Sequence, residues 1–260
     1  MGSGCFSSCQ CNRDSNPIPA QHILYTEKLV KVFGSRTVVN GVDIGVREGE
    51  IVGLLGPNGA GKTTTFYMIV GLTRPDRGRV FLRGQDVTSM PMYRRARRGM
   101  GYLPQEESIF RKLTVEENIL AILETTSMRA GERRQRCEQL LHQFGIGHLA
   151  KNCALTLSGG EKRRLTIARS LVTNPSLLLL DEPFSGVDPI AVHDIQQIIT
   201  NLRTSGLAIL ITDHNVRATL NVVDRAYLIY EGRVESEGNK DFLLRDPISR
   251  KLYLGDAFTM

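Results

Sequence analysis

Short apolar runs alternate with longer segments of helical periodicity along most of the chain. Four runs are apolar and short enough for buried strands, namely residues 50–55, 100–103, 177–180 and 207–211. Helical patterns lie beside them, at 63–70 and at 161–172. Strands that are buried on both faces and alternate with helices are typical of a mostly parallel sheet covered by helices. The pattern therefore predicts an α/β protein.

The stretch at about residues 106–160 has a different pattern. Thr114 and Glu117 have the spacing of a capping box at the start of a helix. A later apolar stripe falls at positions i, i+3, i+4 and i+7, and consists of Cys137, Leu140, Leu141 and Phe144. We expect a helical subdomain here, inserted in a single domain that spans residues 22–260. Its movement would couple nucleotide binding to a partner.

A phosphate-binding loop connects the first of these strands to its helix. The pattern G-x-x-x-x-G-K-[ST] is matched in full by Gly56, Pro57, Asn58, Gly59, Ala60, Gly61, Lys62 and Thr63, with Thr64 next. Glycines let the backbone wrap closely around phosphates, and the N–H groups and the helix dipole attract the anion. Lys62 supplies a positive charge to the β- and γ-phosphates, and the Thr63 hydroxyl supplies a ligand to Mg²⁺. An incidental glycine-rich turn would not combine this match with a strand before it and a helix after it.

A second anion site is predicted at Ser158, Gly159 and Gly160. These residues precede the helical pattern at 161–172, so the hydroxyl and the bare amides lie at a helix N-terminus. Ser-Gly-Gly-Glu alone is an ordinary N-cap. Here it is followed by an apolar strand and then by an acidic pair, so one chain carries two phosphate-binding turns.

The acidic pair Asp181 and Glu182 follows the apolar strand directly. Asp181, at the carboxyl end of a buried strand, is placed to hold Mg²⁺ through its water shell. Glu182, one residue further on, is placed to orient an attacking water as a general base. Two carboxylates that merely end a strand would leave the unbroken leucine run and the following Pro183 unexplained.

From about His22 to Met260 the sequence resembles the nucleotide-binding subunits of ABC transporters. The ordered phosphate loop, Ser158 turn and acidic pair carry the resemblance, and other motifs of the family match in order. Gln105 matches the Q-loop glutamine, residues 185–188 match the D-loop, and His214 matches the switch histidine. The resemblance implies a P-loop, RecA-like ATPase core with a helical and a small β subdomain, using ATP and Mg²⁺.

The resemblance also assigns roles to these residues. It implies that Gln105 contacts Mg²⁺ and acts in catalysis with Glu182 and His214, and that Asp188 contributes to nucleotide binding. His214 would hold the γ-phosphate and the attacking water in line; the alternative is an ordinary core histidine. Phe33 occupies the place of the aromatic residue that stacks on adenine, although a lone Phe is ordinarily a core residue.

Several stretches resemble the ATPases of bacterial lipopolysaccharide export in particular. Residues 53–68, 97–106 and 211–217 match, as does the ending at 253–258. The first stretch also occurs in the ATPases of branched-chain amino-acid importers, whereas the ending and residues 108–114 are more discriminating. The implied function is to power extraction of lipopolysaccharide from the inner membrane. An importer ATPase and a non-transport ABC ATPase remain alternatives.

The partners expected are a second copy of the chain and membrane permeases. Two complementary anion sites are best used across a two-fold interface, with ATP between Lys62 of one chain and Ser158 of the other. Phe110 beside Arg111 and Lys112 offers an apolar anchor flanked by cations for a short helix of a permease. The alternative for Phe110 is packing within the helical subdomain.

Charge and hydropathy limit the other classes of function. The chain has 33 Lys and Arg against 27 Asp and Glu, a net charge of +6, which is moderate. Basic stretches at 89–98, 131–136 and 162–164 are interpreted as solvated helix surfaces and not as a nucleic-acid site. No apolar run approaches the roughly 18 residues of a membrane span, so we expect a peripheral protein on the cytoplasmic face of the inner membrane.

Three of the five cysteines lie close together near the N-terminus. Cys5, Cys9 and Cys11 lie in a polar stretch at residues 1–21 that is expected to be a disordered extension, and a metal site formed by these thiols is the alternative. Cys137 and Cys153 offer no disulfide framework, which fits a reducing cytoplasm. A GTPase is excluded, because in Asn239-Lys240-Asp241-Phe242 a phenylalanine replaces the last aspartate of the guanine-reading motif.

Overall fold

The computed structural model describes residues 22–106 and 108–255. The predictions for Cys5, Cys9 and Cys11 and for the last residues of the chain lie outside the described residues. The strands are β1 His22–Phe33, β2 Arg36–Val42, β3 Gly45–Arg47, β4 Ile51–Leu55, β5 Arg77–Leu82, β6 Gln85–Asp86, β7 Met100–Leu103, β8 Leu177–Asp181, β9 Ala208–Thr212, β10 Arg225–Tyr230 and β11 Arg233–Gly238. The helices are α1 Lys62–Val70, α2 Met92–Ala96, α3 Val115–Leu123, α4 Ala130–Gln143, α5 Gly159–Ser170, α6 Pro189–Thr204, α7 Val216–Leu220, α8 Lys240–Arg245 and α9 Pro247–Ser249, with short helical turns η1 Gly147–Leu149, η2 Ala154–Thr156 and η3 Arg250–Leu254.

A six-stranded sheet forms the middle of the molecule, in the order β11-β10-β4-β9-β8-β7. The five strands from β10 to β7 are parallel, and β11 pairs antiparallel with β10 at the edge. Every residue of β4, β8 and β9 is buried. This confirms the mostly parallel sheet that the apolar runs predict.

Successive residues of these strands contribute to two different hydrophobic cores. Ile51, Leu178 and Ile209 belong to one core, whereas their neighbours Val52 and Leu177 belong to the other. The alternation follows from the two-residue period of a β-strand. The central strands are therefore packed on both faces and connect the two cores.

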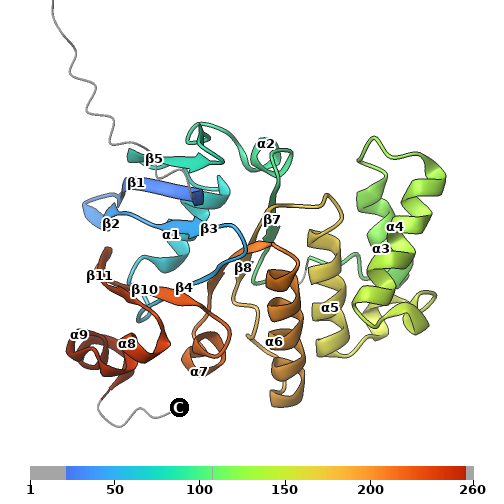
Figure 1. The fold of residues 1–260 in the computed structure, drawn as a ribbon. Coiled ribbons are helices and arrows are strands. Elements are labelled where there is room, and N and C mark those ends of the chain that lie inside the picture. Colours follow the sequence, from blue (N-terminus) through green and yellow to red (C-terminus); the bar gives the residue numbers. More distant parts are fainter. Residues whose placement is uncertain (1–21, 107, 256–260) are drawn as a thin grey trace, which may run out of the picture.

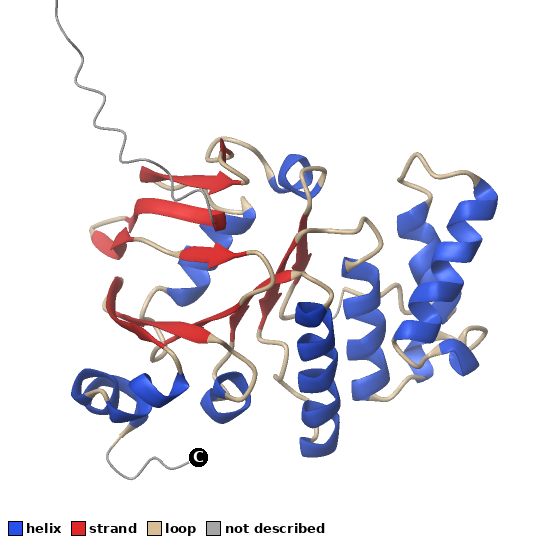
Figure 2. Ribbon diagram, viewed as in Figure 1, coloured by secondary structure: helices blue, strands red, loops and turns tan. Residues whose placement is uncertain are grey.

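One face of the central sheet is covered by α1 and by a small second sheet (Figure 1; Figure 2). The small sheet has the order β2-β1-β5-β6, with β3 paired to β1, and all its pairs are antiparallel. Phe66, Met68 and Ile69 of α1 lie in the core between the two sheets. The helix that follows the phosphate-binding loop is thus held between two layers of strands.

The opposite face of the central sheet is covered by helices, with α5 and α6 beside it and α3 and α4 outermost (Figure 1). The predicted capping box is present at the start of α3, where the Thr114 amide donates to Glu117 Oε2 at 2.7 Å. The stripe formed by Cys137, Leu140, Leu141 and Phe144 is buried, as the periodicity predicts.

Two arginines contradict the interpretation of the basic stretches as solvated surfaces. Arg95 is 1% exposed and Arg163 is 8% exposed. The Arg95 guanidinium donates to the carbonyl oxygens of Met68 at 2.7 Å and Ile69 at 2.5 Å, so it satisfies acceptors at the C-terminal end of α1. The sequence pattern missed this because Arg95 lies among exposed arginines and Arg163 lies between the half-buried Lys162 and Arg164.

Candidate functional site

The phosphate-binding loop is shaped by glycines that no other residue could replace. Gly56 has φ +145°, and a Cβ there would lie 2.1 Å from the carbonyl oxygen of Ile229 on β10. Gly61 has φ +102°, and its Cβ would lie 2.6 Å from the Val38 carbonyl oxygen. The Gly232 amide, just after β10, donates to the Ala60 carbonyl at 2.9 Å. Strand β10 with its turn, together with Val38 of β2, therefore forms a wall against which the loop is fitted.

Lys62 is the first residue of α1, and its ammonium group lies against its own loop. Nζ donates to the carbonyl oxygens of Gly56 at 2.7 Å and Pro57 at 3.0 Å. Burial lowers the pKa of Lys62, and the nearby Glu182 carboxylate acts in the opposite direction. Thr63 is exposed and Thr64 is half-buried at the start of the same helix.

A cleft of about 500 Å³ opens beside this loop. Its lining consists of Arg36, Thr37, Val38, Pro57, Asn58, Gly59, Ala60, Tyr230 and Glu231. Phe33 is the register partner of Arg36 at the end of β1 and is 52% exposed. The alternative that Phe33 is a core residue is therefore wrong.

Gln105, Glu182 and His214 come together at a single oxygen atom. Gln105 Nε2 donates to Glu182 Oε2 at 2.9 Å, and His214 Nδ1 lies 3.2 Å from the same oxygen. They follow β7, β8 and β9, which are adjacent in the central sheet. Because the carboxyl ends of parallel strands share one edge, three residues far apart in sequence meet there. His214 is exposed at this edge, which excludes the alternative of a core histidine.

Glu182 has an unusual backbone conformation. Its φ is +48°, in the left-handed region that few residues other than glycine and asparagine adopt. Its amide donates to the Thr212 carbonyl of β9 at 2.7 Å, so the hydrogen bonds at the end of the sheet hold this conformation. Backbone strain of this kind is concentrated at functional sites.

Asp181 is buried beside Glu182 and is 1% exposed. Burial, and then the neighbouring Glu182 charge, raise the pKa of Asp181 to about 6. Its Oδ2 atom is buried and has no hydrogen-bond partner among the described residues. A buried carboxylate oxygen without a donor fits a cation or its water shell, which is the role expected of Asp181 toward Mg²⁺.

Two buried residues of the site escaped the sequence analysis. Asp213 accepts from the Phe184 amide at 2.8 Å and from the Asn215 amide at 2.7 Å. Arg163 donates from α5 to the Glu182 carbonyl oxygen at 2.7 Å. They fix the segments that carry Glu182 and His214. The position of Asp213 directly before His214 is a sequence signal that could have pointed to it. No comparable sequence signal marks Arg163.

The predicted second anion site begins α5. Ser158 is the N-cap, and its hydroxyl donates to Glu161 Oε2 at 2.8 Å while its own amide donates to the same oxygen at 2.8 Å. A Cβ on Gly160 would lie 3.0 Å from Cβ of Ala191, so α5 and α6 begin close together. Asp188 caps α6 by accepting from the Ile190 and Ala191 amides. The predicted residues Ser158, Gly159, Gly160 and Asp188 thus occupy two neighbouring helix N-termini.

Residues 39–185 match the family model described as "ABC transporter". This chain belongs to the ABC transporter ATPase family. It is therefore an enzyme that binds and hydrolyses ATP. The P-loop, the acidic pair and the Ser158 turn described above all lie within the matched range.

Curated relatives of this ABC ATPase are similar over nearly the whole chain. An ABC transporter ATP-binding protein of Rhizobium meliloti is 56% identical over 91% of this chain and 88% of the relative. The lipopolysaccharide export system ATP-binding protein LptB of Haemophilus influenzae is 52% identical over 92% of this chain and 99% of its own length. LptB of Escherichia coli K12 is 50% identical over 91% of this chain and 99% of its own length.

Solved ABC cassettes have the same fold. The ADP conformation of an ATP-binding cassette of an ABC transporter has a TM-score of 0.81 and 30% identity, and covers 90% of this chain and 99% of that one. A dimeric cassette in a post-hydrolysis state, bound to ADP and Pi, has a TM-score of 0.73 and 26% identity. The match covers 84% of this chain and 98% of that one. The α/β prediction with a P-loop ATPase core is confirmed.

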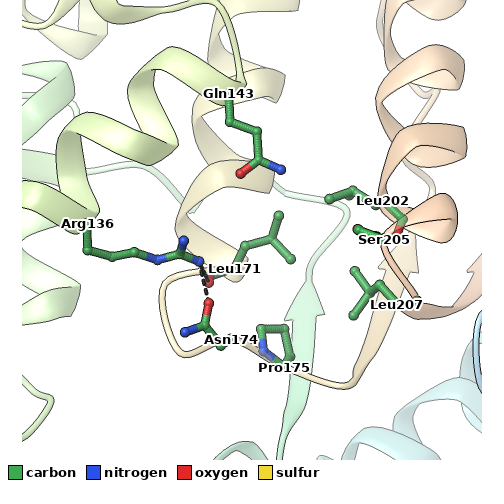
Figure 3. A pocket seen from close by; sticks show the side chains of 9 residues that line it. Arg136, Gln143, Leu171, Asn174, Pro175, Leu202, Ser205 and Leu207 are labelled. Carbon is green, nitrogen blue, oxygen red and sulfur yellow. Dashed lines mark hydrogen bonds between the residues drawn. The ribbon is translucent and has the colours of Figure 1, made fainter.

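A separate cavity of about 220 Å³ lies at the ends of α4, α5 and α6 (Figure 3). Arg136 of α4 donates to the Leu171 carbonyl oxygen at 3.1 Å and to the Asn174 side chain, which ties α4 to the turn before β8. None of the predicted site residues of this ABC ATPase lines it. Within residues 22–106 and 108–255, no helix has the length and hydropathy to cross a membrane.

Proposed function

We propose that this ABC ATPase powers lipopolysaccharide export by extracting lipopolysaccharide from the inner membrane. The observation that carries the proposal is the 52% identity to the Haemophilus export ATPase, which extends over 92% of this chain and 99% of that protein. An alignment of this extent supports the proposal over nearly the whole length of both proteins. The branched-chain importer alternative rests on a stretch around the P-loop that both groups share.

Nucleotide binding is assigned to the loop and the cleft beside it. The backbone N–H groups of Gly56, of residues 58–61 and of the first turn of α1, including Thr63 and Thr64, surround the phosphates, and Lys62 turns from its loop carbonyls to the β- and γ-phosphates. Phe33 stacks on adenine; its exposed ring beside the Arg36 end of the cleft supports this.

Magnesium is assigned to Thr63, Asp181 and Gln105. The unpartnered Oδ2 of Asp181 and the position of Gln105 beside Glu182 support this set. When bound, Mg²⁺ neutralises charge on the transferred phosphoryl group. Glu182 orients and deprotonates the attacking water, and His214 holds the water and the γ-phosphate in line. Gln105 and His214, which both contact Oε2, set the direction of the Glu182 carboxylate.

The working unit is proposed to be a homodimer in which Ser158, Gly159, Gly160 and Asp188 of one chain complete the site of its partner. α1 and α5 pack on opposite faces of the central sheet, so the P-loop and the Ser158 turn of one chain begin helices on different faces. A two-fold arrangement of two chains brings each turn to the other chain's loop. A related cassette has been solved as a dimer with ADP and Pi.

Transmembrane permeases are proposed to dock near Phe110, which places the subunit peripherally on the cytoplasmic face of the inner membrane. Phe110 is 43% exposed, and the Arg169 guanidinium lies 4.6 Å from its ring centroid. The segment between Gln105 and α3 thus joins an exposed aromatic anchor to the Glu182 site. We propose the helical region at about 106–160 as the part that transmits nucleotide occupancy to the permeases.

Depletion of the chain in its own host tests the proposed function. We expect lipopolysaccharide to accumulate at the inner membrane, since extraction needs ATP hydrolysis. A wild-type copy should restore transport to the outer membrane, and a Lys62→Ala copy should not. Normal delivery of lipopolysaccharide in depleted cells, or recovery of the chain with a periplasmic amino-acid-binding system, would contradict the proposal.

A further inference from the structure

The last residues of β1 extend beyond the neighbouring strand β5. The described pairing of β1 with β5 ends at Val30 and Arg77, and Arg77 is the first residue of β5. On the other edge, the pairing of β1 with β2 shifts register between Lys31 and Val32. Residues two apart on a strand present their backbone groups to the same edge, so the Val32 amide lies on the side where β5 is missing. It needs an acceptor from outside the sheet.

Asp76, the residue directly before β5, supplies this acceptor. Its own amide donates to the Val30 carbonyl oxygen at 2.9 Å, and its Oδ2 accepts from the Val32 amide at 2.7 Å. Its Oδ1 accepts from Lys31 Nζ at 2.9 Å, and the same ammonium group donates to the Arg74 carbonyl oxygen at 2.9 Å. One carboxylate therefore holds both the backbone and a side chain at the end of β1.

Lys31 extends this set of contacts to the ring of Phe33. Alternate residues of a strand lie on the same face, so these two side chains are neighbours. Lys31 Nζ lies over the Phe33 ring, 5.4 Å from its centroid, which is within the range of a cation–π attraction. The Lys31 side chain is only 15% exposed, whereas Phe33 is 52% exposed. A fixed cation thus covers one face of the ring and leaves the other face open.

We propose that Asp76 and Lys31 are positioning residues for nucleotide binding. They hold the Phe33 ring in place before ATP arrives, and adenine stacks on the face opposite the ammonium group. A ring that is already fixed loses less conformational freedom on binding, so the stack contributes more to affinity. The inference rests on the proposed stacking of Phe33 on adenine.

The experiment compares ATP with inorganic tripolyphosphate, which offers phosphates without a base. Binding of each to the full chain is measured by calorimetry, with Mg²⁺ withheld so that neither is hydrolysed. Asp76→Ala and Lys31→Met should each weaken ATP binding by about 5-fold, the size of an ordinary cation–π contact. Tripolyphosphate binding should be unchanged. A loss of tripolyphosphate binding in both variants would indicate a role in folding only and would contradict the proposal.

Turnover provides a second readout of the same variants. The ring contacts adenine and not the reacting phosphate, so its contribution is the same in the ground state and in the transition state. With Mg²⁺ present, both variants should therefore raise KM for ATP and leave kcat near the wild-type value. A lower kcat at unchanged KM would also contradict the proposal.

Arg79→Met is the matched control within the same sheet. The Arg79 guanidinium lies 6.0 Å from the Phe81 ring centroid, and its Nε lies 3.8 Å from Glu27 Oε2. The contacts are of the same kind, but Phe81 is buried and does not line the cleft beside the P-loop. Arg79→Met should bind ATP as wild type does. An effect as large as that of Lys31→Met would show that any change in this sheet weakens ATP binding.

Phe33→Ala separates the proposal from the assignment on which it rests. This variant should lose ATP affinity and keep its affinity for tripolyphosphate. If it does so, and Asp76→Ala and Lys31→Met bind ATP as tightly as wild type or more tightly, the positioning role is wrong. If Phe33→Ala itself binds ATP normally, the assignment of adenine to Phe33 is wrong.

Discussion

At the residue scale, Glu182 combines a catalytic assignment with a strained backbone. The left-handed conformation costs a residue with a Cβ about 1–2 kcal/mol, and glycine is free of this cost. Both Glu182→Gly and Glu182→Ala remove the carboxylate, so they differ mainly in the backbone. We expect Glu182→Gly to be more stable than Glu182→Ala by about 1 kcal/mol in urea unfolding, after glycine's greater loss of chain entropy is subtracted.

Ser185 provides the matched control for this pair, since it lies in the same loop without a positive φ. There the usual order should hold, with the alanine variant at least as stable as the glycine variant. An alanine variant of Glu182 that is as stable as the glycine variant would show that the loop relaxes and carries no strain.

Single residues were predictable from the sequence where a motif fixes them locally. The roles proposed for Lys62, Asp181 and Glu182 depend on neighbours in the chain, so spacing alone is enough to predict them. Arg163 acts on residues about twenty positions further along the chain, and its contacts with the Pro183 and Glu182 carbonyl oxygens arise only when α5 packs beside the end of β8. No local pattern distinguishes a buried arginine that donates to carbonyl oxygens from an exposed one.

At the element scale, the four strands predicted from apolar runs, β4, β7, β8 and β9, agree with the structure to within a residue or two, whereas β10 and β11 of the same sheet were not predicted. β4, β8 and β9 are buried on both faces, so each appears as an uninterrupted apolar run. The small sheet gave no such signal, because β1 has register shifts along its pairing with β2 and mixes buried with exposed positions. Only the family resemblance implied a β subdomain there.

The segment between β7 and α3 contains Phe110, the residue proposed to anchor the permeases. Phe110→Ala should reduce recovery of the membrane permeases by about tenfold or more, because an aromatic anchor buried at an interface is typically worth 2 kcal/mol or more. The isolated subunit should stay folded and hydrolyse ATP, since Phe110 is already 43% exposed. The measurement is affinity purification from detergent-solubilised membranes.

Phe242→Ala is the control for this prediction, because Phe242 is 50% exposed on α8 and lies outside the proposed docking segment. It should recover the permeases normally. Equal recovery with both variants would mean that Phe110 contributes only to packing against Arg169 and that the docking surface lies elsewhere.

At the scale of the whole molecule, the arrangement of the two anion sites predicts a nucleotide-dependent dimer. Glu182→Gln should bind ATP, lose nearly all hydrolysis and accumulate as a dimer with ATP and Mg²⁺, because the nucleotide bridges the chains and is not consumed. Size-exclusion chromatography with light scattering measures this. The same variant with ADP serves as the control and should remain largely monomeric. A monomer at saturating ATP would rule out the two-chain site.

The fit of the P-loop against β10 has a consequence for how the protein is made. Gly56 faces the Ile229 carbonyl oxygen, and Ala60 accepts from the Gly232 amide, so the loop is completed by the last quarter of the chain. A ribosome synthesises the loop early and the β10 side of its wall late. We therefore expect the growing chain to carry the full motif long before the loop is held in place, and ATP binding to begin only as synthesis nears its end.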